Sequence, residues 1–485
     1  MSNQDFPDLP GDPSLPSSAA DLQRLIGREE GQYAYSVEDF FRNPDQTGFQ
    51  LSPGGTFLAY AAPYKRRKNI FVQPADGGPA VQVTFETERD IAGFFWSSDQ
   101  RLAYINDSGG DENFRLFAID RDGANAIDLT PFDGVKIDLI DDLPEQEDEL
   151  IIGMNHNNPM LFEPFRINIQ TGNLQQLAPN DNPEEPITGW LTDHDGKLRI
   201  AIKTIDGVNQ HIQYRSHEGE PFRTVVETDF RESLSPLFFA FDNSAVVFCL
   251  SDIGRSRSEI VRFDFEKGQE VGPPVFSHPE VDAGSLLFSR KRKVLLGAAF
   301  TTWKRQVQFF DENRARMQEA LEAQLPGYEV VVTGANRDED RFMVRTYSDR
   351  SLGAYYLFDW PEGRLTPIAE VSPWLREEDM APMKPVAYQA RDGETIHGYL
   401  TLPAHHQEGR LPVVVNPHGG PWVRDSWGYN PEVQLLASRG YAVFQPNYRG
   451  STGYGKSFWM KGFKQWGHDM QNDITDGVQW LVEAG

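Results

Sequence analysis

A histidine and two glycines that follow a short apolar run carry the clearest chemistry in this sequence. The run is Val413-Val414-Val415, and the segment behind it reads His418-Gly419-Gly420-Pro421. Glycines let backbone N–H groups approach a substrate with no Cβ in the way. In acyl transfer, such donors stabilise the oxyanion of the transition state. The segment predicts an oxyanion hole with Gly420 as first donor and Gly419 as second; an ordinary tight turn is the alternative.

Other polar residues near this segment are assigned supporting roles. We expect His418 to order the loop rather than react, although direct catalysis stays open for it. Tyr448 and Arg449 belong to a glycine-rich stretch that ends at Gly455, and we expect both to fix the loop. Asp473 and Asp476 are interpreted as solvated or capping carboxylates on a later helix.

Strands and helices alternate around these residues, from 379 to 485. Two strands are predicted on either side of Asp392-Gly393, and another over 441–444. A helix is predicted over about 431–439, with proline at its first position and glycine just past its end. A last helix is predicted over about 468–484. Its apolar residues share one face: Met470, Ile474, Val478, Leu481 and Val482. This alternation predicts a parallel α/β sheet.

A repeat occupies the region before that sheet, residues 41–378. Its short apolar runs begin at Phe57, Arg101, Glu149, Lys197, Ala245, Lys293 and Arg341. The first two lie 44 residues apart and each later one 48 residues further on. Hairpins with Asp-Gly, Thr-Gly or Glu-Gly turns follow most of them. Repeats of this length with several short strands are typical of a β-propeller, here with seven blades. A β-sandwich array with chance spacing is the alternative.

Two details of the propeller are predicted as well. We expect the seven runs to occupy equivalent strands, the innermost of each blade. The sixth unit differs, because residues 313–324 (NRARMQEALEAQ) are typical of a helix. We therefore expect a helical insertion in that blade.

Composition excludes several classes of protein. The chain of 485 residues has a formal charge of −26, which repels phosphate backbones, so we expect no nucleic-acid partner. The single cysteine, Cys249, excludes an intramolecular disulfide and a Cys-based zinc site, and we expect it in the core. No signal peptide or membrane span is recognisable, so we expect a cytoplasmic protein with no membrane partner. The scattered histidines predict neither a metal nor a cofactor.

The sequence resembles the prolyl oligopeptidase family of serine peptidases, with the acylaminoacyl-peptidase branch as the most similar. The resemblance rests on HGGP at 418–421, GYAVFQPNYRGSTGYG at 440–455, Trp466-Gly467, DITDGVQWL at 473–481 and the opening segment at 35–60. It implies a seven-bladed β-propeller over 41–378 followed by an incomplete α/β-hydrolase domain over 379–485. It also implies that an N-terminal extension, 1–40, packs on the hydrolase domain. The implied activity is cleavage of short peptides through an acyl-enzyme, with the propeller restricting access.

The sequence departs from this family at the nucleophile. No G-x-S-x-G motif occurs among the 485 residues. Ser451 comes nearest, but Arg449 stands where the first glycine is needed. The family places its serine after the last helix seen here, and its acid and histidine later still. We therefore expect the catalytic Ser, Asp and His beyond Gly485, and no peptidase activity from these 485 residues alone.

Other functions stay open from the sequence. A non-catalytic propeller that serves as a binding or scaffold protein is one alternative, and an esterase on the same fold is another. If the protein is a peptidase, the sequence does not distinguish between endopeptidase, acylaminoacyl-peptidase and dipeptidyl-peptidase activity. The absence of a convincing paired-glutamate motif for a free substrate amine weakly disfavours the dipeptidyl type. Short peptides are the expected partners, and a homo-oligomer stays open.

Overall fold

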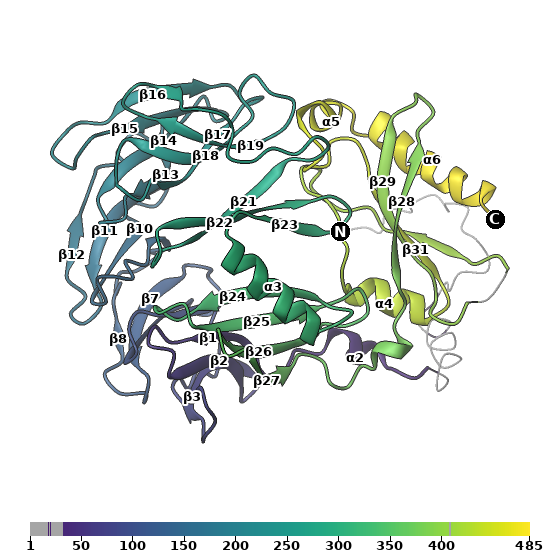
Figure 1. Ribbon diagram of the computed structural model, residues 1–485, viewed down its shortest axis with the longest axis horizontal. Coiled ribbons are helices and arrows are strands. Elements are labelled where there is room, and N and C mark those ends of the chain that lie inside the picture. Colours follow the sequence, from purple (N-terminus) through teal and green to yellow (C-terminus); the bar gives the residue numbers. More distant parts are fainter. Residues whose placement is uncertain (1–17, 19, 21–32, 407–408) are drawn as a thin grey trace, which may run out of the picture.

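The computed structural model describes residues 18, 20, 33–406 and 409–485. Figure 1 shows two regions side by side: a ring of small sheets, coloured purple to green, and a second region with one sheet and several helices, coloured light green to yellow. The chain folds as a seven-bladed β-propeller followed by part of an α/β-hydrolase. The Cys249 side chain is fully buried in the propeller, which confirms its predicted place in the core.

Seven antiparallel sheets follow one another over the described residues 47–370. The first three consist of β1 (Thr47–Leu51), β2 (Phe57–Tyr64), β3 (Arg67–Pro74), β4 (Val81–Gln82); β5 (Gly93–Trp96), β6 (Arg101–Asn106), β7 (Arg115–Asp120), β8 (Ile127–Asp128); and β9 (Ile137–Asp141), β10 (Glu149–Asn158), β11 (Leu161–Asn168), β12 (Leu174–Gln176). The next two consist of β13 (Ile187–Thr192), β14 (Leu198–Ile205), β15 (Asn209–Tyr214), β16 (Arg223–Thr228); and β17 (Leu234–Phe239), β18 (Val246–Ser251), β19 (Glu259–Asp264), β20 (Gln269–Glu270). The last two consist of β21 (Ala283–Ser289), β22 (Val294–Thr301), β23 (Arg305–Phe309); and β24 (Glu329–Ala335), β25 (Arg341–Tyr347), β26 (Ala354–Asp359), β27 (Arg364–Glu370).

The seven apolar runs occupy the same position in every sheet, namely its second strand. The expectation of equivalent strands is therefore confirmed. The expectation that they are innermost is wrong, because the innermost strand of a blade is an edge strand. An interior strand packs on both faces and pairs on both sides, so it holds the longest apolar run of its repeat.

The predicted helical insertion is present in the sixth unit. Helix α3 (Glu312–Gln324) follows β23, and among the described residues the sixth sheet has three strands. Asp311 caps the helix by accepting a bond from the Arg314 backbone N–H at 2.8 Å. Met317 and Leu321 of α3 are buried in one cluster with Phe342 of β25. The helix therefore joins the sixth sheet to the seventh.

The ends of the propeller meet. Phe49 and Tyr60 of the first sheet share a buried cluster with Met343 and Leu357 of the seventh. Arg341 of β25 also donates to the Gly55 carbonyl at 2.6 Å. The first and seventh sheets thus pack on each other, although they lie almost 300 residues apart in the chain.

The α/β region contains one four-stranded sheet in the order β28-β29-β31-β30. Its strands are β28 (Met383–Gln389), β29 (Thr395–Thr401), β30 (Val413–Val415) and β31 (Ala442–Asn447), and its helices are α4 (Pro431–Ser438), α5 (Lys456–Met460) and α6 (Asp469–Glu483). Only β30 and β31 are parallel within the described residues, so the predicted parallel sheet is wrong for the two strands before them. The hairpin turn at Asp392-Gly393 forces those strands to be antiparallel.

The face of α6 that packs on this sheet agrees only in part with the prediction, because Met470 is buried and Leu481 packs on the core of the sheet while other members of the predicted face do not. The buried residues are Met470, Asp473 and Gly477, whereas Val478 and Val482 of the predicted apolar face are 38% and 63% exposed. A Cβ at Gly477 would lie 2.6 Å from the Phe444 ring. Close approach of helix to sheet at Gly477 therefore turns the packed face towards Asp473 and Gly477 and away from Val478 and Val482.

Part of the N-terminal segment reaches the α/β region. Helix α2 (Val37–Phe41) lies beside α4 (Figure 1). Before it, the Tyr35 hydroxyl donates to Asp379 at 2.6 Å, and Arg439 donates to the Tyr35 carbonyl at 2.9 Å. Residues 1–17, 19 and 21–32 of the predicted N-terminal extension lie outside the described residues. Among the described residues, no helix combines the length and apolar character that crossing a membrane requires.

Candidate active site

The glycines of the predicted oxyanion loop lie exposed on the segment that joins β30 to α4. In the described part of the chain, no acceptor binds the backbone N–H of Gly419 or of Gly420. Gly420 has a φ of +116°, and a Cβ built on it would lie 2.8 Å from the Trp422 backbone nitrogen. Position 420 therefore requires glycine. A Cβ at Gly419, by contrast, meets no atom within 4 Å.

His418 is held by contacts with residues that follow β31. Its ring stacks on the Tyr448 ring at 4.6 Å between centroids, and the Tyr448 hydroxyl donates to the His418 carbonyl at 2.7 Å. The His418 Nδ1 atom donates to the Gly419 carbonyl at 2.7 Å, and Nε2 lies 2.8 Å from Ser451 Oγ. These contacts position the loop and leave the glycine N–H groups free.

Ser451 lies beside a histidine, as a nucleophile would, but its surroundings are those of a structural residue. Its side chain is fully buried. Its hydroxyl donates to the Tyr448 carbonyl at 2.6 Å, and its backbone N–H donates to the same carbonyl at 3.0 Å. A catalytic serine needs an accessible oxygen whose proton a base can remove. The proton of Ser451 is held by a carbonyl, so this serine closes the turn after β31.

Arg449 connects the loop after β31 to α6 and to the turn between β28 and β29. It is 5% exposed and donates from Nε and Nη2 to the two carboxylate oxygens of Asp473, at 2.8 and 2.6 Å. It also donates to Asp392 at 2.8 and 3.1 Å, and these bonds lower the pKa of Asp392 to about 2. The interpretation of Asp473 as a solvated or capping carboxylate is wrong, because its side chain is fully buried and paired. Asp476 pairs with Arg391 at 2.6 Å.

Arg424 joins the loop to the propeller. It donates to the carbonyls of Thr301 and Thr302, at the end of β22 and just after it, at 3.3 and 2.9 Å. It also donates to the Tyr454 hydroxyl at 2.8 Å and lies over that ring, 4.2 Å from its centroid. Sequence reasoning missed this residue, because its partners are backbone carbonyls more than 120 residues away and leave no pattern in the sequence.

An aromatic cluster lies next to Gly420 and also joins the two regions. Trp422 packs edge-on against Trp459 and Phe463, at 5.9 and 6.2 Å between centroids. Phe463 in turn packs against Phe230 of the propeller at 5.8 Å. Trp422 and Phe230 are 58% and 51% exposed. The free N–H groups therefore stand beside an apolar surface to which both regions contribute. No group of three or more potential metal ligands is gathered among the described residues.

Comparisons with known proteins assign this arrangement to a family. The profile of the prolyl oligopeptidase family matches residues 427–485. Dipeptidyl aminopeptidase BIII of Pseudoxanthomonas mexicana is 30% identical over 97% of this chain and 69% of its own length. The chain belongs to the prolyl oligopeptidase family. A second relative, dipeptidyl peptidase family member 6 of Caenorhabditis elegans, is 27% identical over 92% of this chain and 65% of its own length.

Solved structures of prolyl oligopeptidase relatives share the fold. A prolyl endopeptidase structure superposes with a TM-score of 0.68 at 14% identity and covers 96% of this chain and 70% of its own. A puromycin hydrolase structure superposes with a TM-score of 0.64 at 16% identity, and the match covers 93% of this chain and 74% of the hydrolase chain. The acylamino-acid-releasing enzyme of Sus scrofa matches a shorter part, 34% identical over 101 residues, or 20% of this chain and 13% of its own. The chain thus spans about two thirds of the length of the two dipeptidyl peptidase relatives.

Proposed function

We propose that this chain is the propeller and oxyanion-loop portion of a serine peptidase that hydrolyses short peptides through an acyl-enzyme. The main support for this proposal is the pair of exposed backbone N–H groups at Gly419 and Gly420, which have no acceptor among the described residues. Gly420 is the first donor and Gly419 the second. Donors of this kind stabilise the charge that develops on the carbonyl oxygen when a nucleophile attacks.

The supporting residues keep these donors in place. His418, Tyr448 and Ser451 hold the loop from behind, and Arg449 secures the turn that carries Tyr448 and Ser451. Arg424 fixes the same loop to the propeller. The propeller therefore has two roles in this proposal. It holds the oxyanion loop in place through Arg424, and it restricts substrate access by covering the α/β region.

The nucleophile, in this proposal, is not among the 485 residues. They contain no G-x-S-x-G, and the serine nearest to a histidine of the loop, Ser451, is fully buried with its hydroxyl bonded to a carbonyl. The chain by itself should then form no acyl-enzyme. A longer form, continuing into a segment with G-x-S-x-G, would supply the serine, the acid and the base.

A fluorophosphonate probe tests this assignment, because it labels activated serines covalently. We expect no labelling of the 485-residue chain and stoichiometric labelling of the longer form. The Ser451→Ala variant of the 485-residue chain is the matched control. If the 485-residue chain is labelled stoichiometrically and Ser451→Ala abolishes the labelling, the nucleophile is Ser451 and the proposal fails.

Release of dipeptides is a second, narrower candidate. It is favoured by the names of the two relatives that match nearly the whole chain, although no paired-glutamate motif for a substrate amine is convincing in the sequence. A fluorogenic dipeptide with a free amine and its N-acetylated form distinguish the two activities in the longer form. A preference for the free amine supports dipeptidyl release, and a preference for the acetylated form supports acylaminoacyl release.

A further inference from the structure

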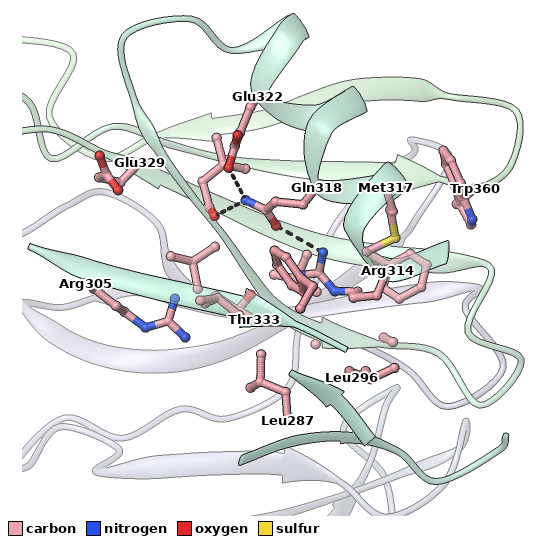
Figure 2. A pocket seen from close by; sticks show the side chains of 18 of the residues that line it. Leu287, Leu296, Arg305, Arg314, Met317, Gln318, Glu322, Glu329, Thr333 and Trp360 are labelled. Carbon is pink, nitrogen blue, oxygen red and sulfur yellow. Dashed lines mark hydrogen bonds between the residues drawn. The ribbon is translucent and has the colours of Figure 1, made fainter. Parts of the chain in front are cut away.

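A cavity of about 770 Å³ lies between the sixth and seventh sheets of the propeller (Figure 2). Strands β21 to β25 and helix α3 form its walls. It occurs where α3 follows β23, in the sheet that has three strands in the described chain. Its size suits a ligand of a few hundred daltons. Neither the proposed oxyanion loop nor its supporting residues contribute to its lining.

The cavity wall is partly apolar and partly polar, and its lining includes three arginines and one lysine. Arg292 pairs with Asp311 and Lys304 pairs with Glu329, which leaves Arg305 and Arg314. Apolar lining residues include Leu287, Leu296, Val307, Phe309, Met317 and Val331. Arg305 lies at the start of β23 and Arg314 in the first turn of α3. Figure 2 shows their guanidinium groups extending into the cavity from two sides.

Neither arginine has an acidic partner. Arg314 donates a single bond, from Nη1 to Gln318 Oε1 at 3.0 Å, and lies 4.9 Å from the centroid of the Phe309 ring. Burial, together with the nearby charge of Arg305, lowers the pKa of Arg314 to about 10, while the charges of Glu322 and Asp311 act in the opposite direction. In the described part of the chain, the Arg305 side chain has no hydrogen bond and no ion pair. Both side chains are partly buried, and a partly buried cation without an ion pair is stabilised by an anion.

The acidic residues of the lining form no ion pair with Arg305 or Arg314 in the described structure, although the charge of Glu322 acts on Arg314 from a distance. Glu329 pairs with Lys304. Glu322 accepts a bond from Gln318 at 2.8 Å. Glu339 accepts from the Ser289 hydroxyl at 2.6 and 2.7 Å. Two cations therefore stay without carboxylates in a chain whose formal charge is −26.

We propose that this cavity binds a small amphipathic carboxylate, with its anionic group between Arg305 and Arg314 and its apolar part on the cavity wall. The planar guanidinium fork matches the geometry of a carboxylate. The C-terminus of a short apolar peptide and a free inorganic oxyanion share the anionic chemistry, and the apolar wall favours the peptide. Binding needs no nucleophile, so the proposal stands independently of the peptidase activity.

Titration calorimetry on the 485-residue chain tests the proposal. The probes are N-acetyl-leucyl-leucine, its C-terminal amide and inorganic phosphate. We expect the free acid to bind at one site per chain, at least about tenfold more tightly than the amide, because the amide lacks the charge. Arg305→Gln and Arg314→Gln should each weaken binding of the acid about tenfold or more.

Matched variants keep the test interpretable. Arg316 lies on the same helix, is exposed and does not line the cavity, so Arg316→Gln should leave the affinity unchanged. Arg314→Lys keeps the charge and should retain part of the affinity lost in Arg314→Gln. Thermal unfolding of each variant establishes that it is folded before its affinity is compared.

Any of the following results would overturn the proposal. One is the absence of binding by the acid at millimolar concentration. Another is equal affinity for the acid and the amide, or an affinity unchanged in folded Arg305→Gln and Arg314→Gln. The last is phosphate binding as tightly as the acid, which would make the ligand an inorganic anion and exclude the peptide.

Discussion

Two arginines removed from water show how the two regions of this molecule differ. In the α/β region, Arg449 is bound by both oxygens of Asp473 and by Asp392. In the propeller, Arg314 makes one bond to an amide oxygen and faces a cavity. The first charge is neutralised within the fold, and the second is left for a ligand. A buried arginine with carboxylate partners, such as Arg449, therefore has a structural role, whereas a partly buried arginine without them, such as Arg314, indicates a binding site.

Replacing each arginine by methionine gives the largest difference in stability. Arg449→Met leaves Asp473 buried without its partner, so we expect a loss of about 3–5 kcal/mol in the free energy of unfolding. Arg314→Met removes a desolvated charge that has no carboxylate, so we expect a change within about 1 kcal/mol. Urea unfolding measures both.

The double variant Arg449→Met/Asp473→Leu provides the control for this comparison. Removing both charges should recover part of the stability lost in Arg449→Met, because no unpaired carboxylate is left. Equal losses in Arg449→Met and Arg314→Met would show that the two arginines do not differ as described.

Acid should weaken the α/β region through Asp392. Bonds from Arg449 lower the pKa of this carboxyl to about 2, below its ordinary value of 3.8. A carboxyl with a lowered pKa in the folded state contributes stability above its unfolded pKa and loses it as the pH falls towards the folded value. The difference in stability between the wild type and Asp392→Asn should therefore shrink between about pH 4 and pH 2. Urea midpoints across this range measure it, and a constant difference would contradict the assignment.

Tyr448→Phe has the smallest expected effect on stability. It removes the bond to the His418 carbonyl and keeps the stacked ring, so we expect a loss of about 0.5–1.5 kcal/mol. Tyr441→Phe is the control, since that hydroxyl has no hydrogen bond in the described structure and the residue is 38% exposed. Identical urea midpoints for the two variants would argue against the anchoring role of Tyr448.

The propeller could be predicted from the sequence because its pattern is repeated. Seven apolar runs at nearly constant spacing gave the number of sheets, and the NRARMQEALEAQ segment gave the inserted helix. The α/β region was predicted less completely, because a local pattern does not state which helix face packs on a sheet. In α6, the close contact at Gly477 sets the face that packs on the sheet, whereas the apolar periodicity predicted a face rotated towards Val478 and Val482.

The candidate site could be located from the sequence, but its supports could not. HGGP and the glycine-rich stretch after β31 are short motifs whose chemistry is local. The pairing of Arg449 with Asp473 and Asp392, and the bonds from Arg424 to propeller carbonyls, join residues far apart in the chain. The unpaired state of Arg305 and Arg314 is likewise visible only once every neighbour is placed.

Turnover of the longer form with Gly420→Ala, compared with Gly419→Ala, tests the central claim most directly. At Gly420 the added Cβ would lie 2.8 Å from the Trp422 backbone nitrogen, and the φ of +116° disfavours any residue other than glycine, so we expect the N–H group to be displaced. A Cβ at Gly419 has no atom within 4 Å. Loss of one oxyanion donor lowers turnover about 100- to 1000-fold. We predict that loss for Gly420→Ala, near-normal turnover for Gly419→Ala, and folded protein for both by thermal unfolding. Full activity in folded Gly420→Ala would contradict the account.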